Sequence, residues 1–181
     1  MPKVLTVSGS PSSPSRTTAL LHHIADALLV DGHEVRHLSA RSLPPGPLLH
    51  GDTAHVAIRD ALTLVDWADA LVIGTPVYKA SYSGLLKTLL DVLPEGGLAE
   101  KTVLPLVTGG SPAHMLALDY ALRPVLTALG CDRVLRGRFV LDRHISTDPI
   151  EGTVLEAETE AGVRNAVDRF VHALAAPVAS A

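Results

Sequence analysis

Val4-Leu5-Thr6-Val7-Ser8-Gly9-Ser10-Pro11-Ser12-Ser13-Pro14-Ser15-Arg16-Thr17-Thr18 is the stretch that decides the fold. A short apolar strand runs into a loop of small and hydroxyl-bearing residues, and an amphipathic helix follows at once. The N–H groups of such a loop and the N-terminus of the helix converge on one spot, which favours a phosphate. Side-chain donors come from Ser10, Ser15, Arg16 and Thr17. The competing interpretation is that Ser15 only caps the helix.

This loop lacks the groups that phosphate chemistry needs. It matches neither G-x-x-x-x-G-K-[ST] nor G-x-G-x-x-G, and it has no cysteine nucleophile. No general base or metal-binding carboxylate lies beside the hydroxyls. The loop therefore predicts that a phosphate is bound and not cleaved.

The composition of the 181 residues is typical of one globular domain. The chain is 47% hydrophobic and 19% charged, and its net charge of −4 argues against nucleic acid or an anionic membrane as partner. The longest uncharged run, residues 102–118, is interrupted by prolines and glycines, so it does not predict a membrane span. A lone cysteine, Cys131, excludes an intramolecular disulfide. We expect one domain over residues 1–175, a frayed tail over 176–181 and a cytoplasmic location.

Apolar runs alternate with helical patterns along the chain. Residues 4–7, 70–73 and 103–107 are almost continuously apolar, as in parallel strands that are covered on both faces, although Pro105 interrupts the third ladder. The alternation predicts a three-layer α/β/α sandwich around a parallel sheet. The predicted strands are residues 3–8, 34–39, 70–75, 102–108 and 134–141; the predicted helices are 17–31, 54–67, 83–93, 114–129 and 154–175; residues 41–52 are predicted to form a loop.

Two further loops leave the apolar strands at the edge where parallel sheets bind ligands. The segment Thr75-Pro76-Val77-Tyr78-Lys79, with the residues up to Gly84, holds two of the three tyrosines and favours a planar ring. Tyrosines that cap a core or an interface would look the same. The segment Thr108-Gly109-Gly110-Ser111 offers N–H groups without Cβ hindrance, although an ordinary turn also uses glycines. Three loops at consistent positions favour a ligand site.

Pro124 lies four residues after Tyr120 in a predicted helix, so it has no N–H to donate to the Tyr120 carbonyl. We predict a kink or a π-bulge at Tyr120, with a simple bend of a surface helix as the alternative.

The nine histidines show no metal-binding spacing, and we predict no metal. His114 follows the paired glycines without a visible partner, and Cys131 is interpreted as structural.

Taken in order, these motifs resemble those of the flavodoxin-like NAD(P)H-dependent FMN reductases. The resemblance is strongest to the alkanesulfonate-type NADPH-dependent FMN reductases of two-component monooxygenase systems. It rests on Gly9-Ser10-Pro11 with Ser15-Arg16-Thr17 and on residues 75–80, 82–91, 104–110, 113–114 and 119–126, and it covers roughly residues 3–142. It implies a five-stranded parallel sheet of order 2-1-3-4-5, the cofactors FMN and NADPH, with NADH possible, and a homo-oligomer, a dimer or a tetramer.

The same resemblance implies roles for individual residues. The FMN phosphate would be held by Ser10, Ser15, Arg16 and Thr17; the isoalloxazine would be lined by Pro76, Val77 and Tyr78, with Lys79 among the cofactor-binding residues; the pyrimidine edge would contact Thr108, Gly109, Gly110 and Ser111. Tyr120 would form a π-helix at a tetramer interface near the flavin, as in reductases that use FMN as a passing substrate. No side chain is expected to be catalytic, because the cofactor transfers the hydride.

The expected activity is hydride transfer from NADPH to FMN, with release of reduced FMN to a partner flavin-dependent monooxygenase of sulfonate or organosulfur metabolism. Two alternatives remain open. One is an enzyme that retains FMN and reduces a quinone, an azo compound or a metal oxyanion. The other is a non-enzymatic FMN carrier of the flavodoxin type.

Overall fold

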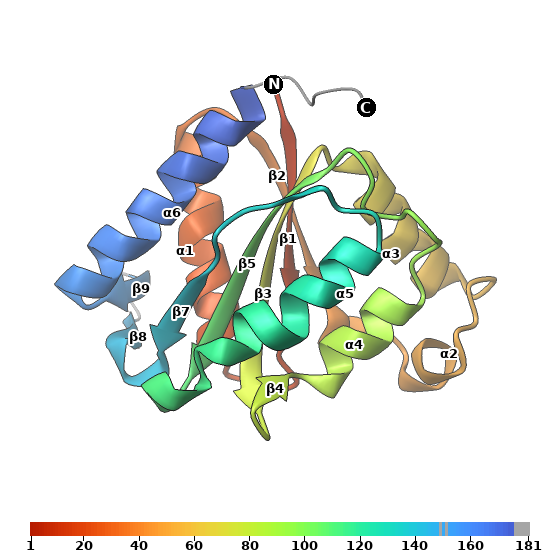
Figure 1. Ribbon diagram of the computed structural model, residues 1–181, viewed down its shortest axis with the longest axis horizontal. Coiled ribbons are helices and arrows are strands. Elements are labelled where there is room, and N and C mark those ends of the chain that lie inside the picture. The colour runs from red at the N-terminus through yellow and green to blue at the C-terminus, as the bar shows by residue number, and fades with distance from the viewer. Residues whose placement is uncertain (149, 151, 176–181) are drawn as a thin grey trace.

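Strands and helices alternate along the chain in the computed structural model, which describes residues 1–175 apart from 149 and 151 (Figure 1). The predicted tail, residues 176–181, lies outside the described residues. The main elements are β1 (Lys3–Ser8), α1 (Arg16–Val30), β2 (Glu34–Ser39), α3 (Val56–Trp67), β3 (Ala70–Tyr78), α4 (Gly84–Asp91), β5 (Thr102–Gly109), α5 (Arg123–Ala128), β6 (Arg133–Val134), β7 (Arg138–Leu141) and α6 (Ala157–Ala175). The shorter ones are α2 (Pro45–His50), β4 (Ser81–Tyr82), β8 (Ile145–Asp148), β9 (Gly152–Leu155), 3₁₀ turns at Ala40–Ser42, Pro112–His114 and Asp142–His144, and a π-helix at Leu118–Leu122.

The sheet has the order β2-β1-β3-β5, with β6 and β7 both on the outer side of β5. All of these pairs are parallel. If β6 and β7 are counted as the two halves of a fifth strand, this is the predicted flavodoxin-like order 2-1-3-4-5, which is thus confirmed. The short β4 adds an antiparallel pair at the end of β3, and β8 pairs with β9 as a separate hairpin.

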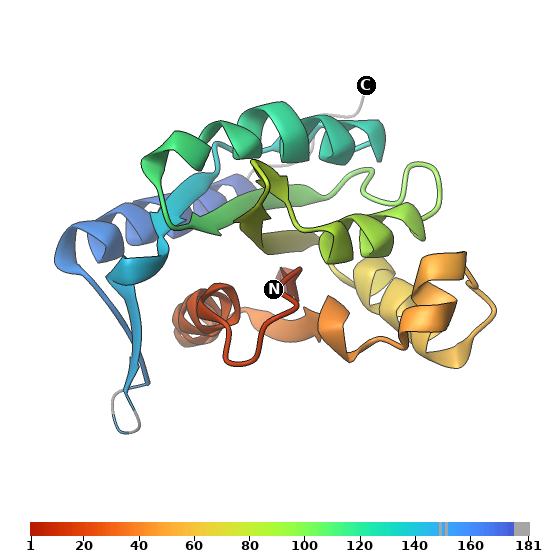
Figure 2. The ribbon, with the colours of Figure 1, turned by 90° about the horizontal axis from the view of Figure 1, so that it is seen from below.

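Helices cover both faces of the sheet and bury its apolar strands (Figures 1 and 2). One core forms against α1 and α6, and the other against α3, α4, the π-helix and α5. Successive residues of one strand enter opposite cores, because side chains alternate across a strand. Val72 of β3 packs with α1 and α6, whereas Leu71 and Ile73 pack on the other side. This explains why the central strands are continuously apolar in sequence.

The fifth strand is divided into β6 and β7 at the position that faces Pro105 of β5. The Leu135 N–H donates to the Val103 carbonyl, so by the two-residue repeat the backbone of Pro105 also faces the outer strand. Pro105 has no N–H to offer there, and its position falls between β6 and β7. Gly137 fills this break against the Pro105 carbonyl, which an added Cβ would approach to 2.3 Å. The single predicted strand over residues 134–141 is therefore wrong.

Three other sequence predictions need correction. Residues 41–52 are not all loop, because Pro45 begins the short helix α2 at a position where its missing N–H costs nothing. The last helix begins at Ala157 and not at residue 154, since Val154 belongs to β9. The helix predicted over residues 114–129 is divided into the π-helix and α5. No helix in the described part of the chain is long and apolar enough to cross a membrane.

Candidate flavin-binding site

A cavity of about 670 Å³ lies at the carboxyl ends of the parallel strands. Eight of the predicted site residues line it: Ser10, Ser15, Arg16, Thr17, Pro76, Val77, Tyr78 and Thr108. They come from the ends of β1, β3 and β5 and from the first turn of α1, which the sheet order places side by side. In Figure 1 these strand ends and the start of α1 lie at the lower edge of the molecule. The structure thus brings the three predicted loops to one place.

The first loop ends in a helix N-terminus with free donors. Ser15 is the N-cap of α1, and its Oγ accepts a hydrogen bond from the Thr18 N–H at 3.1 Å. Ser15 therefore does cap the helix, and this cap leaves other N–H groups of the first turn without a partner in the helix. The N–H groups of Arg16 and Thr17 occupy the first turn and have no acceptor within the helix. These two groups, with the positive end of the helix dipole, remain available to an anion.

Hydroxyl pairs join the loops to one another. The Thr17 and Thr108 hydroxyls are hydrogen-bonded at 2.7 Å and buried, so α1 is tied to the end of β5 across β3. The Ser8 and Thr18 hydroxyls, 2.8 Å apart, tie α1 to β1. Either hydroxyl can be the donor of the Thr17–Thr108 bond, and Thr17 also offers its backbone N–H in the first turn of α1 to an anion. These bonds fix the walls of the cavity before any ligand enters it.

The second loop is a tight hairpin. Val77 and Tyr78 pair with Tyr82 and Ser81, and the connecting Lys79 and Ala80 both have positive φ, +50° and +63°. Positive φ at both residues of a two-residue loop is the signature of a type I′ turn. Tyr78 is 44% exposed, and its hydroxyl lies 3.3 Å from the Ser12 hydroxyl of the first loop. Lys79 is exposed in the turn and is not among the residues that line the cavity.

The third loop contributes less to the cavity than the sequence predicts. Gly109 is buried, and an added Cβ would meet the Phe139 ring at 3.1 Å. Gly110 is exposed, and a Cβ there would meet nothing within 4 Å. Ser111 caps the turn Pro112–His114. Of this loop only Thr108 lines the cavity, while Gly110 leaves open space for a ligand edge to approach the backbone.

Another wall of the cavity was missed by the sequence analysis. It is formed by the turn Asp142–His144 (η4) and by β8, through Asp142, Arg143, Ile145, Ser146 and Thr147. The turn follows β7 directly, so it leaves the same edge of the sheet as the other three loops. The position of Arg143 after the fifth predicted strand was the signal available in the sequence. Arg143 was not predicted as a site residue because the segment around it is short and polar.

The helix with Tyr120 has the irregular form that Pro124 predicts. Leu118–Leu122 form a π-helix, in which the Arg123 N–H donates to the Leu118 carbonyl, five residues back. Tyr120 is 78% exposed on this helix.

Two further candidate reactive residues, Cys131 and His114, show no sign of acting as a nucleophile or an acid. Cys131 is buried, and burial raises the pKa of its thiol, while His114 lies outside the cavity lining.

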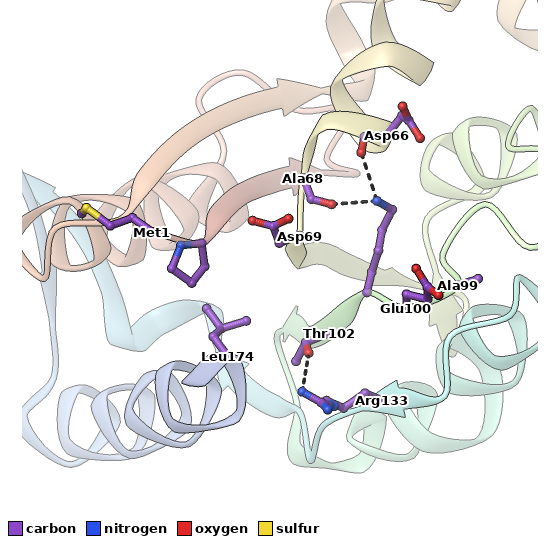
Figure 3. Close-up of a pocket in the computed structure, with 11 residues that line it drawn as sticks. Met1, Asp66, Ala68, Asp69, Ala99, Glu100, Thr102, Arg133 and Leu174 are labelled. Atoms are coloured by element: carbon purple, nitrogen blue, oxygen red, sulfur yellow. Dashed lines mark hydrogen bonds between the residues drawn. The ribbon is translucent and has the colours of Figure 1, made fainter. Parts of the chain in front are cut away.

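A second hollow, of about 700 Å³, lies at the opposite end of the strands (Figure 3). The two cationic side chains that line it, Lys101 and Arg133, already bind backbone oxygens. The Lys101 ammonium donates to the carbonyls of Asp66 and Ala68 at the end of α3, and Arg133 donates to the Ala173 carbonyl. This hollow holds none of the three predicted loops. The predicted loops therefore meet at the carboxyl-end cavity and not at this hollow.

Comparison with known proteins shows the family of the chain. Residues 2–145 match the family model described as NADPH-dependent FMN reductase. The chain belongs to this FMN reductase family. As an NAD(P)H-dependent FMN reductase it is an oxidoreductase that uses FMN and a reduced nicotinamide nucleotide.

Two relatives and one solved structure show how far this FMN reductase resembles known members. An FMN reductase (NADPH) of Escherichia coli is 46% identical over 79% of this chain and 75% of its own length. The NADH-dependent FMN reductase SfnE of Pseudomonas putida is 33% identical over 92% of this chain and 91% of its own. The apo crystal structure of the NADH:FMN oxidoreductase EMOB has a TM-score of 0.87 and 37% identity, covering 99% of this chain and 92% of its own.

Proposed function

We propose that the reductase binds FMN in this cavity, with the phosphate on the first loop, and releases reduced FMN to a flavin-dependent monooxygenase. The placement rests on one observation above all. The free N–H groups of Arg16 and Thr17, the Arg16 side chain and the buried Ser10 face a cavity that adjoins the tyrosine-bearing hairpin. A phosphate at a helix N-terminus with an arginine beside it is a well-matched pair.

The size and chemistry of the cavity fit this cofactor. A volume of about 670 Å³ is within the range of about 300 to 1,000 Å³ that small-molecule sites occupy. Pro76 and Val77 provide an apolar strip, and Tyr78 provides an aromatic side chain, where the isoalloxazine is proposed to lie. Gly110 leaves space for the pyrimidine edge, with Gly109 and Ser111 beside it in the chain. We propose that Lys79 contacts the flavin from the exposed turn of the hairpin.

In this arrangement the protein binds and orients the two nucleotides. FMN, when bound, supplies the chemistry by accepting a hydride from NAD(P)H. The hydroxyl pair Thr17–Thr108 holds two walls in fixed positions. The N-terminus of α1, capped by Ser15, would hold the phosphate of FMN. The side chains therefore need to provide position and electrostatics and no nucleophile.

The test uses purified protein after extensive dialysis. We expect it to be colourless and to oxidise NADPH or NADH only when FMN is added. After anaerobic turnover, ultrafiltration should recover the reduced FMN in the filtrate. A protein that stays yellow and keeps the reduced flavin behind the filter would contradict release and favour the FMN-retaining alternative. A yellow protein that oxidises neither nucleotide would instead favour the flavodoxin-type carrier.

We further propose that the reductase is a cytoplasmic homo-oligomer, a dimer or a tetramer, with Tyr120 at the contact between copies. Met115, Leu116 and Tyr120 are 51%, 59% and 78% exposed and lie close together in the sequence before α5. Large apolar side chains exposed in a group indicate an interaction surface. Light scattering after size exclusion should give a lower mass for Tyr120→Ser than for the wild type. Leu29→Ser, on the exposed side of α1, is the matched control and should keep the wild-type mass.

A further inference from the structure

The wall formed by η4 and β8 carries an arginine that the flavin site as proposed does not use. Arg143 is exposed, lines the cavity, and forms no hydrogen bond or ion pair with any residue that the structure describes. Arg16, from the first loop, lines the same cavity and is equally unpaired within the described chain. Two cations on separate elements thus face one cavity. The carboxylate of Asp142 is the sole acidic group among the described lining residues.

The backbone that carries Arg143 is held firmly from behind. The next residue, His144, contacts the start of α6 with both ring nitrogens: Nδ1 lies 2.8 Å from the Thr159 hydroxyl and Nε2 lies 2.9 Å from a Glu156 carboxylate oxygen. The Glu156 N–H also donates to the His144 carbonyl at 3.0 Å. Ile145, which follows, is buried in the core. The turn is therefore fixed in place, although the Arg143 side chain itself is exposed.

The hairpin behind this wall is also attached to the flavin side of the cavity. The Thr153 hydroxyl of β9 donates to the Ala19 carbonyl in the first part of α1. Figure 2 shows the hairpin running beside α1 at the end where that helix begins. Ser146 and Thr147 of β8 line the cavity together with Arg143. The Ser146 hydroxyl donates to the Val154 carbonyl at 3.2 Å, whereas the Thr147 hydroxyl can donate to the same anion that the guanidinium binds.

We propose that Arg143, with the Thr147 hydroxyl, forms a second phosphate-binding point in the cavity, which takes a phosphate of the nicotinamide nucleotide. FMN has one phosphate, and the N-terminus of α1 with Arg16 already offers a complete site for it. NADH brings a diphosphate into the crevice, and NADPH brings a further phosphate. The planar guanidinium binds a phosphate through two parallel hydrogen bonds, so it suits this role better than a lysine.

The proposal rests on the placement of FMN given above, and its chemistry allows two sources for the phosphate. One source is the diphosphate that NADH and NADPH share. The other is the extra phosphate of NADPH. Asp142 lies next to Arg143 in the sequence and lines the same wall, where its carboxylate can accept from a ribose hydroxyl.

The experiment compares Arg143→Gln with Arg143→Lys, Arg16→Gln and the wild type. The dissociation constant for FMN is measured by flavin fluorescence without any nicotinamide nucleotide, and KM is measured separately for NADPH and NADH. Loss of a charged hydrogen-bond donor should raise the affected constant about tenfold. Arg143→Lys should recover part of this, and added salt should reduce the difference between variants. Arg169→Gln is the charge-matched control, because it removes an exposed arginine of α6 that has no partner among the described residues.

Each outcome assigns or removes the proposed contact. A rise in the FMN constant alone would place Arg143 on the flavin phosphate and would overturn the second phosphate-binding point. An equal rise in KM for NADPH and NADH assigns it to the diphosphate, and a rise for NADPH alone assigns it to the additional phosphate. If Arg16→Gln weakens FMN binding and Arg143→Gln changes none of the three constants, this inference is wrong while the FMN placement stands. If Arg16→Gln does not weaken FMN binding, the placement itself fails.

Discussion

At the scale of single residues, Gly137 is the clearest case in which the backbone allows no side chain. It lies in the break between β6 and β7, where an added Cβ would come within 2.3 Å of the Pro105 carbonyl and 2.7 Å of Leu118 Cδ1. A carbonyl in a central strand cannot move aside as the end of a flexible side chain can. The contact therefore couples the sheet edge to the π-helix.

We predict that Gly137→Ala lowers the free energy of unfolding by about 3 kcal/mol, because the new methyl group overpacks a rigid site. Urea denaturation followed by circular dichroism measures this. Gly84→Ala is the control, since a Cβ at Gly84 meets nothing within 4 Å, and it should change stability by less than about 0.5 kcal/mol. Equal stabilities for the two variants would show that the break at Pro105 is not tightly packed.

His37 of β2 is the residue with the largest electrostatic consequence for stability. Burial, and then the positive charge of the neighbouring His22, lower the pKa of His37 from 6.5 to about 4. Its Nδ1 lies 2.8 Å from the Thr6 hydroxyl, and the rings of His22 and His37 have centroids 4.7 Å apart. The folded protein therefore keeps this imidazole neutral at pH values at which the unfolded chain protonates it.

The sign of the pH effect follows from the lowered pKa. The unfolded chain binds the proton more tightly, so this contribution to stability is complete above about pH 7 and is lost as the pH falls through 6.5 toward 4. Between pH 7 and pH 5 the loss should be on the order of 1 kcal/mol. Urea unfolding at the two pH values measures it. The loss should shrink in His37→Gln and stay unchanged in His50→Gln, an exposed histidine of α2.

At the scale of elements, the β3–β4 hairpin is closed by two residues that are poorly suited to it. Lys79 and Ala80 both adopt positive φ, which costs about 1 kcal/mol or more for a residue with a Cβ. Replacing them by Asn-Gly, the preferred pair of a type I′ turn, should raise the free energy of unfolding by about 1 kcal/mol. Ala27→Gly in the exposed interior of α1 should lower it by a similar amount. If the variant with both Lys79→Asn and Ala80→Gly were less stable than the wild type, the turn would not be strained.

What the sequence predicts at this scale depends on how long and how apolar each element is. Strands β1, β3 and β5 were found because they are buried on both faces, and the loops that follow them were located with them. The hairpin β8–β9 was missed because its short, mostly polar strands pair only with each other. Arg143 was missed with it, since its place in the cavity depends on β7 ending at the same edge as β1 and β3. The division of the fifth strand could not be predicted, because the sequence does not show that Pro105 of β5 faces it.

At the scale of the whole molecule, the third layer is completed by a helix that follows the family-matched segment. That segment ends at residue 145, yet Phe170 of α6 is fully buried against the sheet with α1. Phe170→Ala should lower the free energy of unfolding by about 4 kcal/mol, because it leaves a large cavity in that core. His172→Ala, exposed on the same helix, should have little effect. Thermal and urea unfolding measure the stability of both variants. If Phe170→Ala were as stable as the wild type, α6 would not be needed for the core.

The hairpin β8–β9 leaves and re-enters the fold at one point, because its first and last residues, Ile145 and Leu155, pair with each other. Both of these residues are buried, whereas the strands between them extend away from the core. The segment is thus a module with a fixed base and a replaceable outer part. Exchanging it for hairpins of other lengths offers an engineering route to reshape one wall of the crevice while the sheet and the phosphate loop stay in place.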